Sequence, residues 1–247
     1  MRKFPEFIEP MLTPSSMDSY FIRAALFTAV EQAVSLFSGT LLDVGCGQMP
    51  YRDFILSHGG VTHYLGLDLD NNTLYRNSPD ITWDGETIPL PGDSVDCVTA
   101  TEVLEHCPKP GSTLAEIFRV LQPGGIFFFT VPFLWPLHDA PHDQYRYTPF
   151  ALERLLVEAG FVQTRLRPMS GWDISLAQML GLYLRRRPMP TLLRSLLSII
   201  FYPVFLLLAR FNQKDVAPVN DKSIEEIFSQ SVMPVGISGI AYKPVVA

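Results

Sequence analysis

The stretch LLDVGCGQMPY, residues 41 to 51, joins an apolar run to a turn that contains two glycines. Asp43 ends the apolar part, and Gly45 and Gly47 follow it with one residue between them. In an open α/β sheet, a glycine turn after the first strand lets the backbone approach a ligand that lies across the carboxyl ends of the strands. The stretch therefore predicts the first strand and the first ligand-binding turn of such a sheet.

Short apolar runs alternate with helical stretches along the chain from residue 38 to residue 170. Four of these runs are flanked by turn residues and are too apolar for a half-exposed sheet, a pattern typical of buried parallel strands. The runs are GTLLDVG (39–45), HYLGLDL (63–69), SVDCVTA (94–100) and GIFFFTV (125–131). Helices are expected at 110–125 and 148–161, the second with Thr148 as its cap and Gly160 as its stop. This order predicts an α/β fold with a Rossmann-like, doubly wound, mostly parallel sheet.

The composition limits the chain to one sizeable core and one embellishment, because it has 247 residues, of which 47% are hydrophobic. The formal net charge of −6 gives no basic face, so we expect no nucleic-acid partner. The three cysteines form no CxxC pair, and the N-terminal stretch MRKFPEFIEPMLTP lacks the apolar segment of a signal peptide. These features favour a cytoplasmic protein.

We divide the chain into four parts on this basis. Residues 1–37 form an N-terminal covering helix region, 38–170 the core, 171–231 an apolar helical insertion, and 232–247 the last strand of the core. Within the insertion, residues 185–211 are far more apolar than a surface loop. Pro203 and Arg194 predict two short helices that lie in a membrane interface or cover the site, in place of one spanning helix. A buried hairpin or a homodimer interface is the alternative, and the triplet Arg185 to Arg187 favours anionic lipid.

The residues after the two glycines indicate which ligand the turn holds. A dinucleotide site requires G-x-G-x-x-G, but here Gln48, Met49 and Pro50 follow Gly47, so the pyrophosphate interpretation is weakened. Asp68 lies 23 residues after Gly45, at the end of the second predicted strand, where a carboxylate binds both hydroxyls of a ribose. A ribose without a pyrophosphate predicts an adenosyl ligand.

Four motifs in this order resemble the class I S-adenosylmethionine-dependent methyltransferases of the type 11-like kind. The motifs are LDVGCG, GLDLD, LPGDSVDCVTATEVLEHCPKP and RVLQPGG, and the resemblance covers about residues 38–170. It implies a seven-stranded sheet, S-adenosylmethionine as cofactor, and methyl transfer as the reaction. At Met49 the sequence departs from the family, where many members have a third glycine.

The resemblance also implies a position for each cofactor residue. Asp43, Gly45, Cys46 and Gly47 would flank the methionine and ribose, Asp68 and Leu69 the ribose and adenine, Asp84 and Gly85 the adenine edge, and Thr101 and Glu102 the sulfonium end. Simpler roles are open for several of them. Asp43 could cap a turn, Asp68 could be a solvated loop acid, Asp84 with Gly85 could form an ordinary turn, and the Cys46 thiol could simply pack.

The segment VPFLWPLHDAPHDQYRYT (131–148) concentrates polar side chains after the last predicted parallel strand. Methyl transfer is an in-line displacement that requires alignment, exclusion of water and, for a nucleophile that carries a proton, a base. The predicted catalytic residues are His106, His138, His142, Asp143 and Arg146. The alternative is that His138 and Asp143 tether the loop over packed tyrosines.

The repeat HDAPHD also offers nitrogen and oxygen ligands, but Pro141 prevents its two histidines from sharing a helical face, so we predict no metal site. PYRDF (50–54) together with PLHDAPHDQYRYTPFALERLLVEAGF (136–161) resembles methyltransferases associated with bacterial surface polysaccharides. That resemblance implies O-methylation of a small molecule, a sugar or a lipid-linked sugar. The alternatives are C- or N-methylation of a lipid-like small molecule, and a catalytically silent adenosyl-binding subunit.

Overall fold

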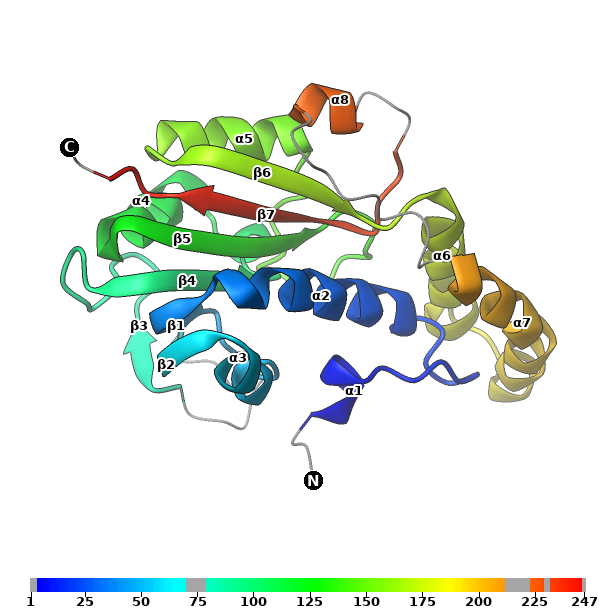
Figure 1. Cartoon of the computed structure of the whole chain (residues 1–247). Coiled ribbons are helices and arrows are strands. Elements are labelled where there is room, and N and C mark those ends of the chain that lie inside the picture. Colours follow the sequence, from blue (N-terminus) through cyan, green and yellow to red (C-terminus); the bar gives the residue numbers. More distant parts are fainter. Residues whose placement is uncertain (1–3, 70–78, 212–222, 229–231, 246–247) are drawn as a thin grey trace.

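A computed structural model describes residues 4–69, 79–211, 223–228 and 232–245. These residues form a seven-stranded sheet in the order β3-β2-β1-β4-β5-β7-β6 (Figure 1). The strands are β1 (Ser38–Val44), β2 (Gly60–Leu69), β3 (Ile81–Trp83), β4 (Val95–Thr101), β5 (Leu121–Pro132), β6 (Val162–Met169) and β7 (Gly236–Tyr242). The four predicted apolar runs lie in β1, β2, β4 and β5, so these strands are confirmed.

The first five strands pair in parallel, whereas β7 pairs antiparallel with both β5 and β6. The last strand of the chain thus lies between β5 and β6, although about a hundred residues separate it from β5. The predicted Rossmann-like, doubly wound fold with an apolar helical insertion before the last strand is confirmed.

Helices cover both faces of the sheet. They are α1 (Pro5–Ile8), α2 (Tyr20–Ala33), η1 (Val34–Leu36), α3 (Arg52–His58), η2 (Leu104–His106), α4 (Pro110–Val120), α5 (Pro149–Glu158), α6 (Trp172–Arg186), α7 (Thr191–Phe211) and α8 (Ile224–Phe228). Buried side chains of α2, α3 and α6 form one core cluster with the sheet, and those of α4, α5 and α8 form the other. Burial on both faces explains why the central strands carry apolar runs without a regular apolar and polar alternation.

Local signals set the ends of two helices. Thr148 caps α5, since its side-chain oxygen accepts a hydrogen bond from the Ala151 N–H at 3.3 Å. Helix α4 ends earlier than its pattern predicts, because Leu121 already belongs to β5 and the Pro-Gly-Gly segment lies within that strand. Gly124 adopts a positive φ of 82° there, so the glycine permits a bend in the strand in place of a helix stop.

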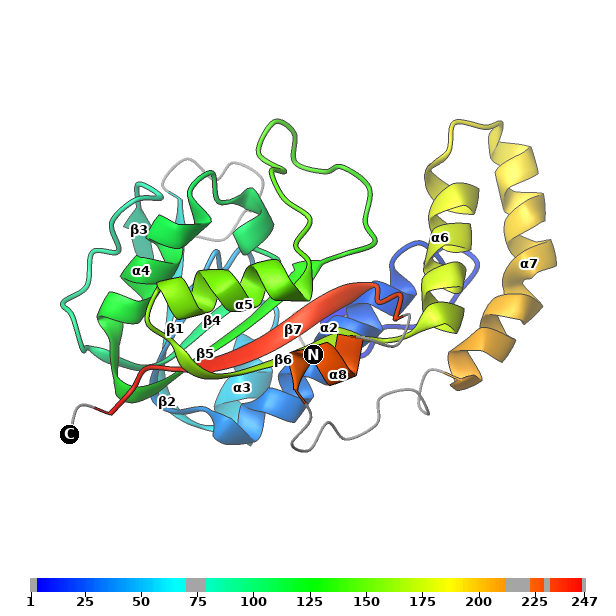
Figure 2. The ribbon, with the colours of Figure 1, turned by 90° about the horizontal axis from the view of Figure 1, so that it is seen from above.

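Within the insertion, the apolar stretch 185–211 contains one long helix, α7, where we expected two short ones. Helices α6 and α7 lie side by side as a hairpin that stands apart from the sheet (Figure 2). Helix α7 continues through Pro203, so the expected break is wrong. Proline removes one helical hydrogen bond at a cost of about 3 kcal/mol. Buried residues on both sides of it, Ser198 and Phe205, hold the two halves of the helix on the same body.

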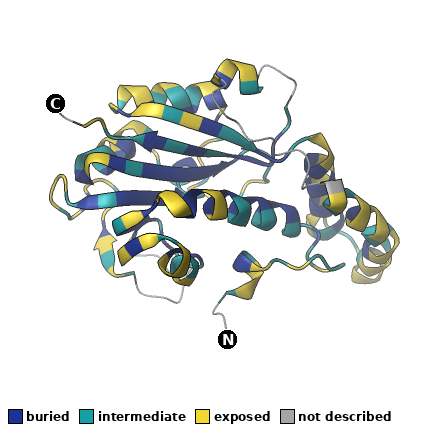
Figure 3. Ribbon diagram, in the orientation of Figure 1, coloured by how far each residue is buried: buried dark blue, intermediate teal, exposed yellow. Residues whose placement is uncertain are grey.

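Helix α7 also presents most of its apolar surface to the outside (Figure 3). Within the described part of the chain, residues Thr191–Arg210 form the one helix long and apolar enough to cross a membrane, and only 11% of that stretch is buried. The boundaries that we drew at residues 37, 170 and 231 stay a prediction.

Candidate active site

The glycine turn after β1 packs directly against the segment that follows β4. Gly45 has φ of +66°, and a Cβ added there would lie 2.5 Å from the Cγ2 atom of Val103. Both the backbone conformation and the close contact exclude a larger residue. Gly47 also has a positive φ, of 49°. The turn therefore requires glycine at position 45, and Gly47 takes a conformation that favours glycine.

Met49 takes the left-handed conformation in the same turn, with φ of 52°. A side chain in this region costs about 1–2 kcal/mol relative to glycine. The Met49 sulfur lies 3.4 Å from the Arg52 Nη1 atom. The departure from the family's third glycine thus changes the side chain, while the backbone still takes a path suited to glycine.

Asp68 ties the end of β2 to this turn. Its Oδ2 atom accepts a hydrogen bond from the Gly47 N–H at 2.9 Å, and its Oδ1 atom accepts one from the Leu69 N–H at 2.8 Å. The residue is only 6% exposed, which rules out the solvated loop acid. Asp68 and the turn are therefore one preorganised unit, and its contact with a ribose stays a prediction.

Asp43 lies beneath the turn with both carboxylate oxygens engaged. Tyr64 donates its hydroxyl to Oδ2 at 2.5 Å, and Thr99 donates its hydroxyl to Oδ1 at 2.9 Å. Burial raises the pKa of Asp43 to about 6, and the two hydroxyl bonds offset only part of this rise. Asp43 thus links three strands, and its contact with a cofactor stays a prediction.

Leu69 and Gly85 come together where β2 and β3 end. A Cβ on Gly85, which has φ of +85°, would lie 3.3 Å from the Leu69 Cδ2 atom, and Leu69 is 47% exposed. Asp84 forms a local turn, because its Oδ1 atom accepts the N–H groups of Glu86 and Thr87, both at 2.8 Å. These hydrogen bonds lower the pKa of Asp84. Asp84 therefore forms the ordinary turn that was its simpler role, and the exposed side chain of Leu69 lies beside Gly85.

Thr101 and Glu102 follow the course that the sequence predicted, at the end of β4. Glu102 has φ of 57°, and its N–H donates to the Thr130 carbonyl at 3.0 Å. Burial raises the pKa of Glu102 to about 7. Among the described residues, its Oε1 atom has no hydrogen-bond partner. A strained backbone and an unsatisfied carboxyl oxygen at one position are typical of functional sites.

Cys46 is a packing residue within the turn. It is 4% exposed, and its Sγ atom would lie 2.9 Å from a Cβ added at Gly66 of the neighbouring strand. Burial raises the pKa of the Cys46 thiol, so the thiol stays protonated. The simpler of its two predicted roles therefore fits the structure.

Asp143 and Arg146 hold the acceptor loop, residues 133–148, in its shape. The Arg146 guanidinium donates to Asp143 Oδ1 at 2.6 Å and to Oδ2 at 2.8 Å, and it also bonds the Trp135 carbonyl. Arg146 is the main cause that lowers the pKa of Asp143 to about 2. A carboxylate with so low a pKa is a poor base near neutral pH. Asp143 thus tethers the loop, as the alternative proposed for it with His138, but its main partner is Arg146.

His106 and His138 meet at this loop, but the His142 ring does not join them. The two rings have centroids 4.8 Å apart. His138 Nδ1 lies 3.2 Å from Asp143 Oδ2, and His106 Nδ1 lies 3.3 Å from the His142 carbonyl oxygen. His142 is exposed and contributes its carbonyl group. Of the three predicted histidines, the structure therefore brings two into one site.

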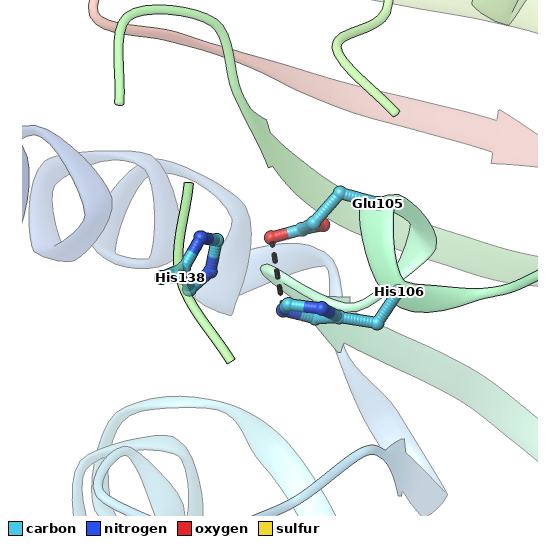
Figure 4. A group of neighbouring side chains, drawn as sticks. All are labelled: Glu105, His106 and His138. Atoms are coloured by element: carbon cyan, nitrogen blue, oxygen red, sulfur yellow. Dashed lines mark ion pairs between the residues drawn. The ribbon is translucent and has the colours of Figure 1, made fainter. Parts of the chain in front are cut away.

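Glu105 is a site residue that the sequence reasoning missed. Its backbone carbonyl accepts the N–H groups of Gln144 and Tyr145 at 2.8 and 3.2 Å, which fixes the acceptor loop on η2. Its side chain is 0% exposed, and neither carboxyl oxygen has a hydrogen-bond partner among the described residues. Its Oε1 atom lies 3.8 Å from His106 Nε2, and His138 faces the pair (Figure 4). A glutamate beside a histidine in a short segment was the only sequence signal.

Comparison with known proteins identifies the class to which this site belongs. A family model described as a methyltransferase domain matches residues 42–129. The ubiquinone/menaquinone biosynthesis C-methyltransferase UbiE of Methylobacterium nodulans is 30% identical over 174 residues, which cover 53% of this chain and 69% of that protein. The chain therefore belongs to the class I S-adenosylmethionine-dependent methyltransferases.

One further sequence relative and one solved structure are also methyltransferases. An uncharacterized methyltransferase of Mycobacterium ulcerans is 33% identical over 100 residues, which cover 37% of this chain but only 38% of that relative. A solved S-adenosylmethionine-dependent methyltransferase from Mesorhizobium loti superposes with a TM-score of 0.54 at 16% identity, covering 92% of this chain and 99% of that one.

The residues at the carboxyl ends of the strands fit S-adenosylmethionine, the cofactor of this family. Gly45 and Gly47 hold the turn after β1 in a positive-φ conformation, and Asp68 stands where a ribose is bound in related folds. The buried Oε1 atom of Glu102 lacks a partner within the described chain, as expected of a group that faces a ligand.

Proposed function

We propose that the chain methylates a hydroxyl oxygen of a sugar or lipid-linked sugar. When bound, the cofactor supplies a methyl group activated on a sulfonium. The single observation that carries this proposal is the pair of imidazoles, His106 and His138, at the end of β4 and in the loop after β5. A hydroxyl acceptor must lose a proton during transfer, and imidazole is the side chain best suited to take it near neutral pH.

The hydrogen bonds at the two Nδ1 atoms support this role. His138 Nδ1 pairs with the Asp143 carboxylate, and His106 Nδ1 pairs with the carbonyl of His142. Each Nδ1 therefore carries the proton, and each Nε2 keeps a lone pair. Burial, followed by the neighbouring His138, lowers the pKa of His106, which favours its neutral form. The Arg146 and Asp143 pair positions the loop without taking part in proton transfer.

The test is methylation of identified acceptors. Purified protein is incubated with isotope-labelled S-adenosylmethionine and with sugar-nucleotide and lipid-linked saccharide fractions, and products are identified by mass spectrometry and NMR. We expect a methyl ether, and release of S-adenosylhomocysteine also excludes a silent adenosyl-binding subunit. His138→Gln should slow turnover about 100-fold, the usual contribution of a general base. The exposed His63 provides the matched control, His63→Gln.

C-methylation of a lipid-like small molecule is the second candidate, and similarity to a quinone-biosynthesis C-methyltransferase favours it. The same experiment separates the two, because a new carbon–methyl bond gives a different NMR signal from a methyl ether. A C-methyl product would overturn the O-methylation proposal.

We also propose that the α6–α7 hairpin docks on an anionic membrane, with the protein peripheral to the cytoplasmic face. The 21 residues of α7 span about 30 Å at 1.5 Å per residue, comparable to the apolar thickness of a bilayer. Large apolar side chains are exposed along α7, at Leu192, Leu193, Leu196, Ile199, Ile200, Val204, Leu206 and Leu207. Such a continuous patch is rare on a monomeric soluble surface.

The charge of the hairpin supports lipid as the partner. Residues 172–211 contain five arginines and one aspartate, a net charge of +4 in a chain whose total is −6. Arg194 donates to the Arg187 carbonyl at 3.2 Å, so four of the five arginines lie near the connection between the two helices, and Arg210 lies at the far end of α7. Arg186 lies over the Trp135 ring at 4.8 Å, which joins the hairpin to the acceptor loop. A lipid-linked acceptor would thus reach the site from the membrane.

Vesicle co-sedimentation tests the docking. We expect binding to phosphatidylglycerol vesicles that salt weakens only in part, because apolar burial persists when charges are screened. Leu196→Ser, Ile199→Ser and Leu207→Ser together should reduce binding at least tenfold. Phe205 is unsuitable for this test, because it is fully buried and stacks on Phe21.

The matched control is a variant with Phe150→Ser and Val157→Ser, which removes exposed apolar side chains from α5. It should bind vesicles like the wild type. If the wild type ignores vesicles and light scattering shows a dimer that the α7 variant loses, the hairpin is a homodimer interface and the membrane proposal is wrong.

A further inference from the structure

Three potential metal ligands from two segments of the chain face one another at the acceptor side of the site. Glu105 and His106 come from η2, and His138 comes from the loop after β5 (Figure 4). Each offers one ligand atom, and these atoms all lie within 4.8 Å of one another. Bound to Zn²⁺ at about 2.1 Å, such atoms are about 3.4 Å apart, so small side-chain rotations would close the site.

The Glu105 carboxyl group is the observation that points to a cation. It is 0% exposed, and neither oxygen has a hydrogen-bond partner within the described chain. A buried carboxylate without partners is costly, and proteins keep such groups where they pair with a charge or coordinate a metal. Arg146, the nearby cation, already forms a bidentate pair with Asp143.

The surroundings of both histidines match those of metal ligands. A metal-binding histidine usually donates its other ring N–H to a carboxylate or a backbone carbonyl, which fixes the ring and its tautomer. His138 has the Asp143 carboxylate at Nδ1, and His106 has the His142 carbonyl at Nδ1. In both residues Nε2 remains as the free ligand atom, and His106 Nε2 already lies toward Glu105.

We propose that Glu105, His106 and His138 bind one divalent transition-metal ion, for which Zn²⁺ is the probe. Two imidazoles and one carboxylate suit Zn²⁺ or Fe²⁺, whereas Mg²⁺ and Ca²⁺ prefer an all-oxygen set. Three protein ligands leave a coordination position open, as in catalytic metal sites. This ligand set shares only His138 with the HDAPHD repeat that the sequence analysis set aside, and its other two ligands come from η2.

The role of the ion in catalysis rests on the proposed O-methylation. An acceptor hydroxyl at the open position would be acidified by the cation, and its proton would pass to solvent. The oxygen lone pair then forms the bond to the methyl carbon, while the electrons of the carbon–sulfur bond return to sulfur and give S-adenosylhomocysteine. An acceptor with two adjacent oxygen atoms fits such a site best, because both can bind the ion.

Metal binding is measured directly on the stripped full chain, without acceptor. Equilibrium dialysis with elemental analysis should show one Zn²⁺ per chain and much weaker Mg²⁺ binding. Glu105→Gln and His138→Gln should each weaken Zn²⁺ binding at least tenfold. His142→Gln is the matched control, since it keeps the backbone carbonyl that holds His106 while changing a ring outside the trio. It should bind Zn²⁺ like the wild type.

A second measurement uses Co²⁺ in place of Zn²⁺. The visible spectrum of the wild type should show nitrogen and oxygen ligation without the charge-transfer band of a thiolate, which excludes Cys107 as the ligand. Circular dichroism and S-adenosylhomocysteine affinity verify that each variant is folded.

Either of two results would overturn the proposal: no stoichiometric Zn²⁺ binding, or binding that survives both Glu105→Gln and His138→Gln. Methyl ethers formed by chelated protein in that case would leave the two histidines as bases, so the proposed function would stand without the metal. Zn²⁺ binding that depends on Glu105 and His138, without formation of any methyl ether, would support the metal site and overturn the proposed O-methylation.

Discussion

The cofactor side and the acceptor side of the candidate site differ in the hydrogen bonds that their acidic side chains accept. On the cofactor side, both oxygens of Asp68 accept backbone hydrogen bonds. On the acceptor side, both oxygens of Glu105 are buried without hydrogen-bond partners among the described residues. The comparison teaches that folding alone supplies partners for both oxygens of Asp68, whereas the carboxyl group of Glu105 stays without a hydrogen-bond partner within the described chain.

The largest expected effect is on the cofactor side, from Gly45→Ala. Left-handed strain and the contact with Val103 together should lower the free energy of unfolding by about 2–5 kcal/mol. Denaturant unfolding measures this loss, and calorimetry should show weaker S-adenosylhomocysteine binding. Gly111→Ala is the matched control, because a Cβ there has nothing within 4 Å and lies in the first turn of α4. It should leave stability unchanged or slightly higher.

Asp43 sharpens the comparison through pH. Burial raises its pKa from 3.8 to about 6, so the folded protein holds a proton there that the unfolded chain has lost. The contribution of Asp43 to stability therefore falls as pH rises from about 4 to about 6, by about 2–3 kcal/mol. Unfolding curves of the wild type and Asp43→Asn should diverge across this window, with the variant more stable above it. Asp53→Asn changes an exposed acid and is the control, so its stability should follow that of the wild type at every pH. An Asp43→Asn curve that stays parallel to the wild-type curve would contradict the prediction.

Glu105→Gln should change the free energy of unfolding in the opposite direction from Asp68→Asn. Burial raises the pKa of Glu105 well above its usual value, so folding near neutral pH must either protonate this carboxyl group or bury its charge. Glu105→Gln removes this cost and should raise the stability of the metal-free protein by about 1–3 kcal/mol. Asp68→Asn should lower stability, because its carboxylate holds the Gly47 and Leu69 N–H groups. Thermal unfolding of both variants compares the two sides directly. If both changes shift stability in the same direction, the contrast between the two sides is wrong.

Asp68→Ala tests the cofactor side by binding. The variant should lose about 1–3 kcal/mol of S-adenosylhomocysteine affinity, the range of charged hydrogen bonds to hydroxyl groups. In the same calorimeter, the wild type should bind NAD and ATP much more weakly. Unchanged affinity in the variant would remove Asp68 from the cofactor site.

The sequence predicted the fold where strands are buried on both faces, because β1, β4 and β5 each contain a short apolar run between turn residues. It missed the strands at the two edges of the sheet. Strand β3 has only three residues, and β6 contains Arg165, Arg167 and Pro168, so neither carries an apolar run. Pro203 led us to predict two short helices in place of α7. The prediction failed because tertiary contacts at Phe205 outweighed the local effect of the proline.

The cofactor side could be predicted because its residues belong to one motif or follow a strand at a regular interval. The acceptor side depends on contacts between distant segments, and no local pattern encodes these. Glu105 meets His138 only because Gln144 and Tyr145 bind the Glu105 carbonyl. The pairing of Asp143 with Arg146 likewise turned a predicted base into a positioning residue.

The position of β7 sets an order for folding during synthesis. Strands β5 and β6 cannot become neighbours through β7 until residues Gly236–Tyr242 have left the ribosome, after the whole α6–α7 hairpin has emerged. A nascent chain therefore presents its most apolar helix while one half of the sheet still has unpaired edges, the state in which chains aggregate most readily. A surface that captures the hairpin early would act as a chaperone for the sheet as well as a docking site for the finished enzyme.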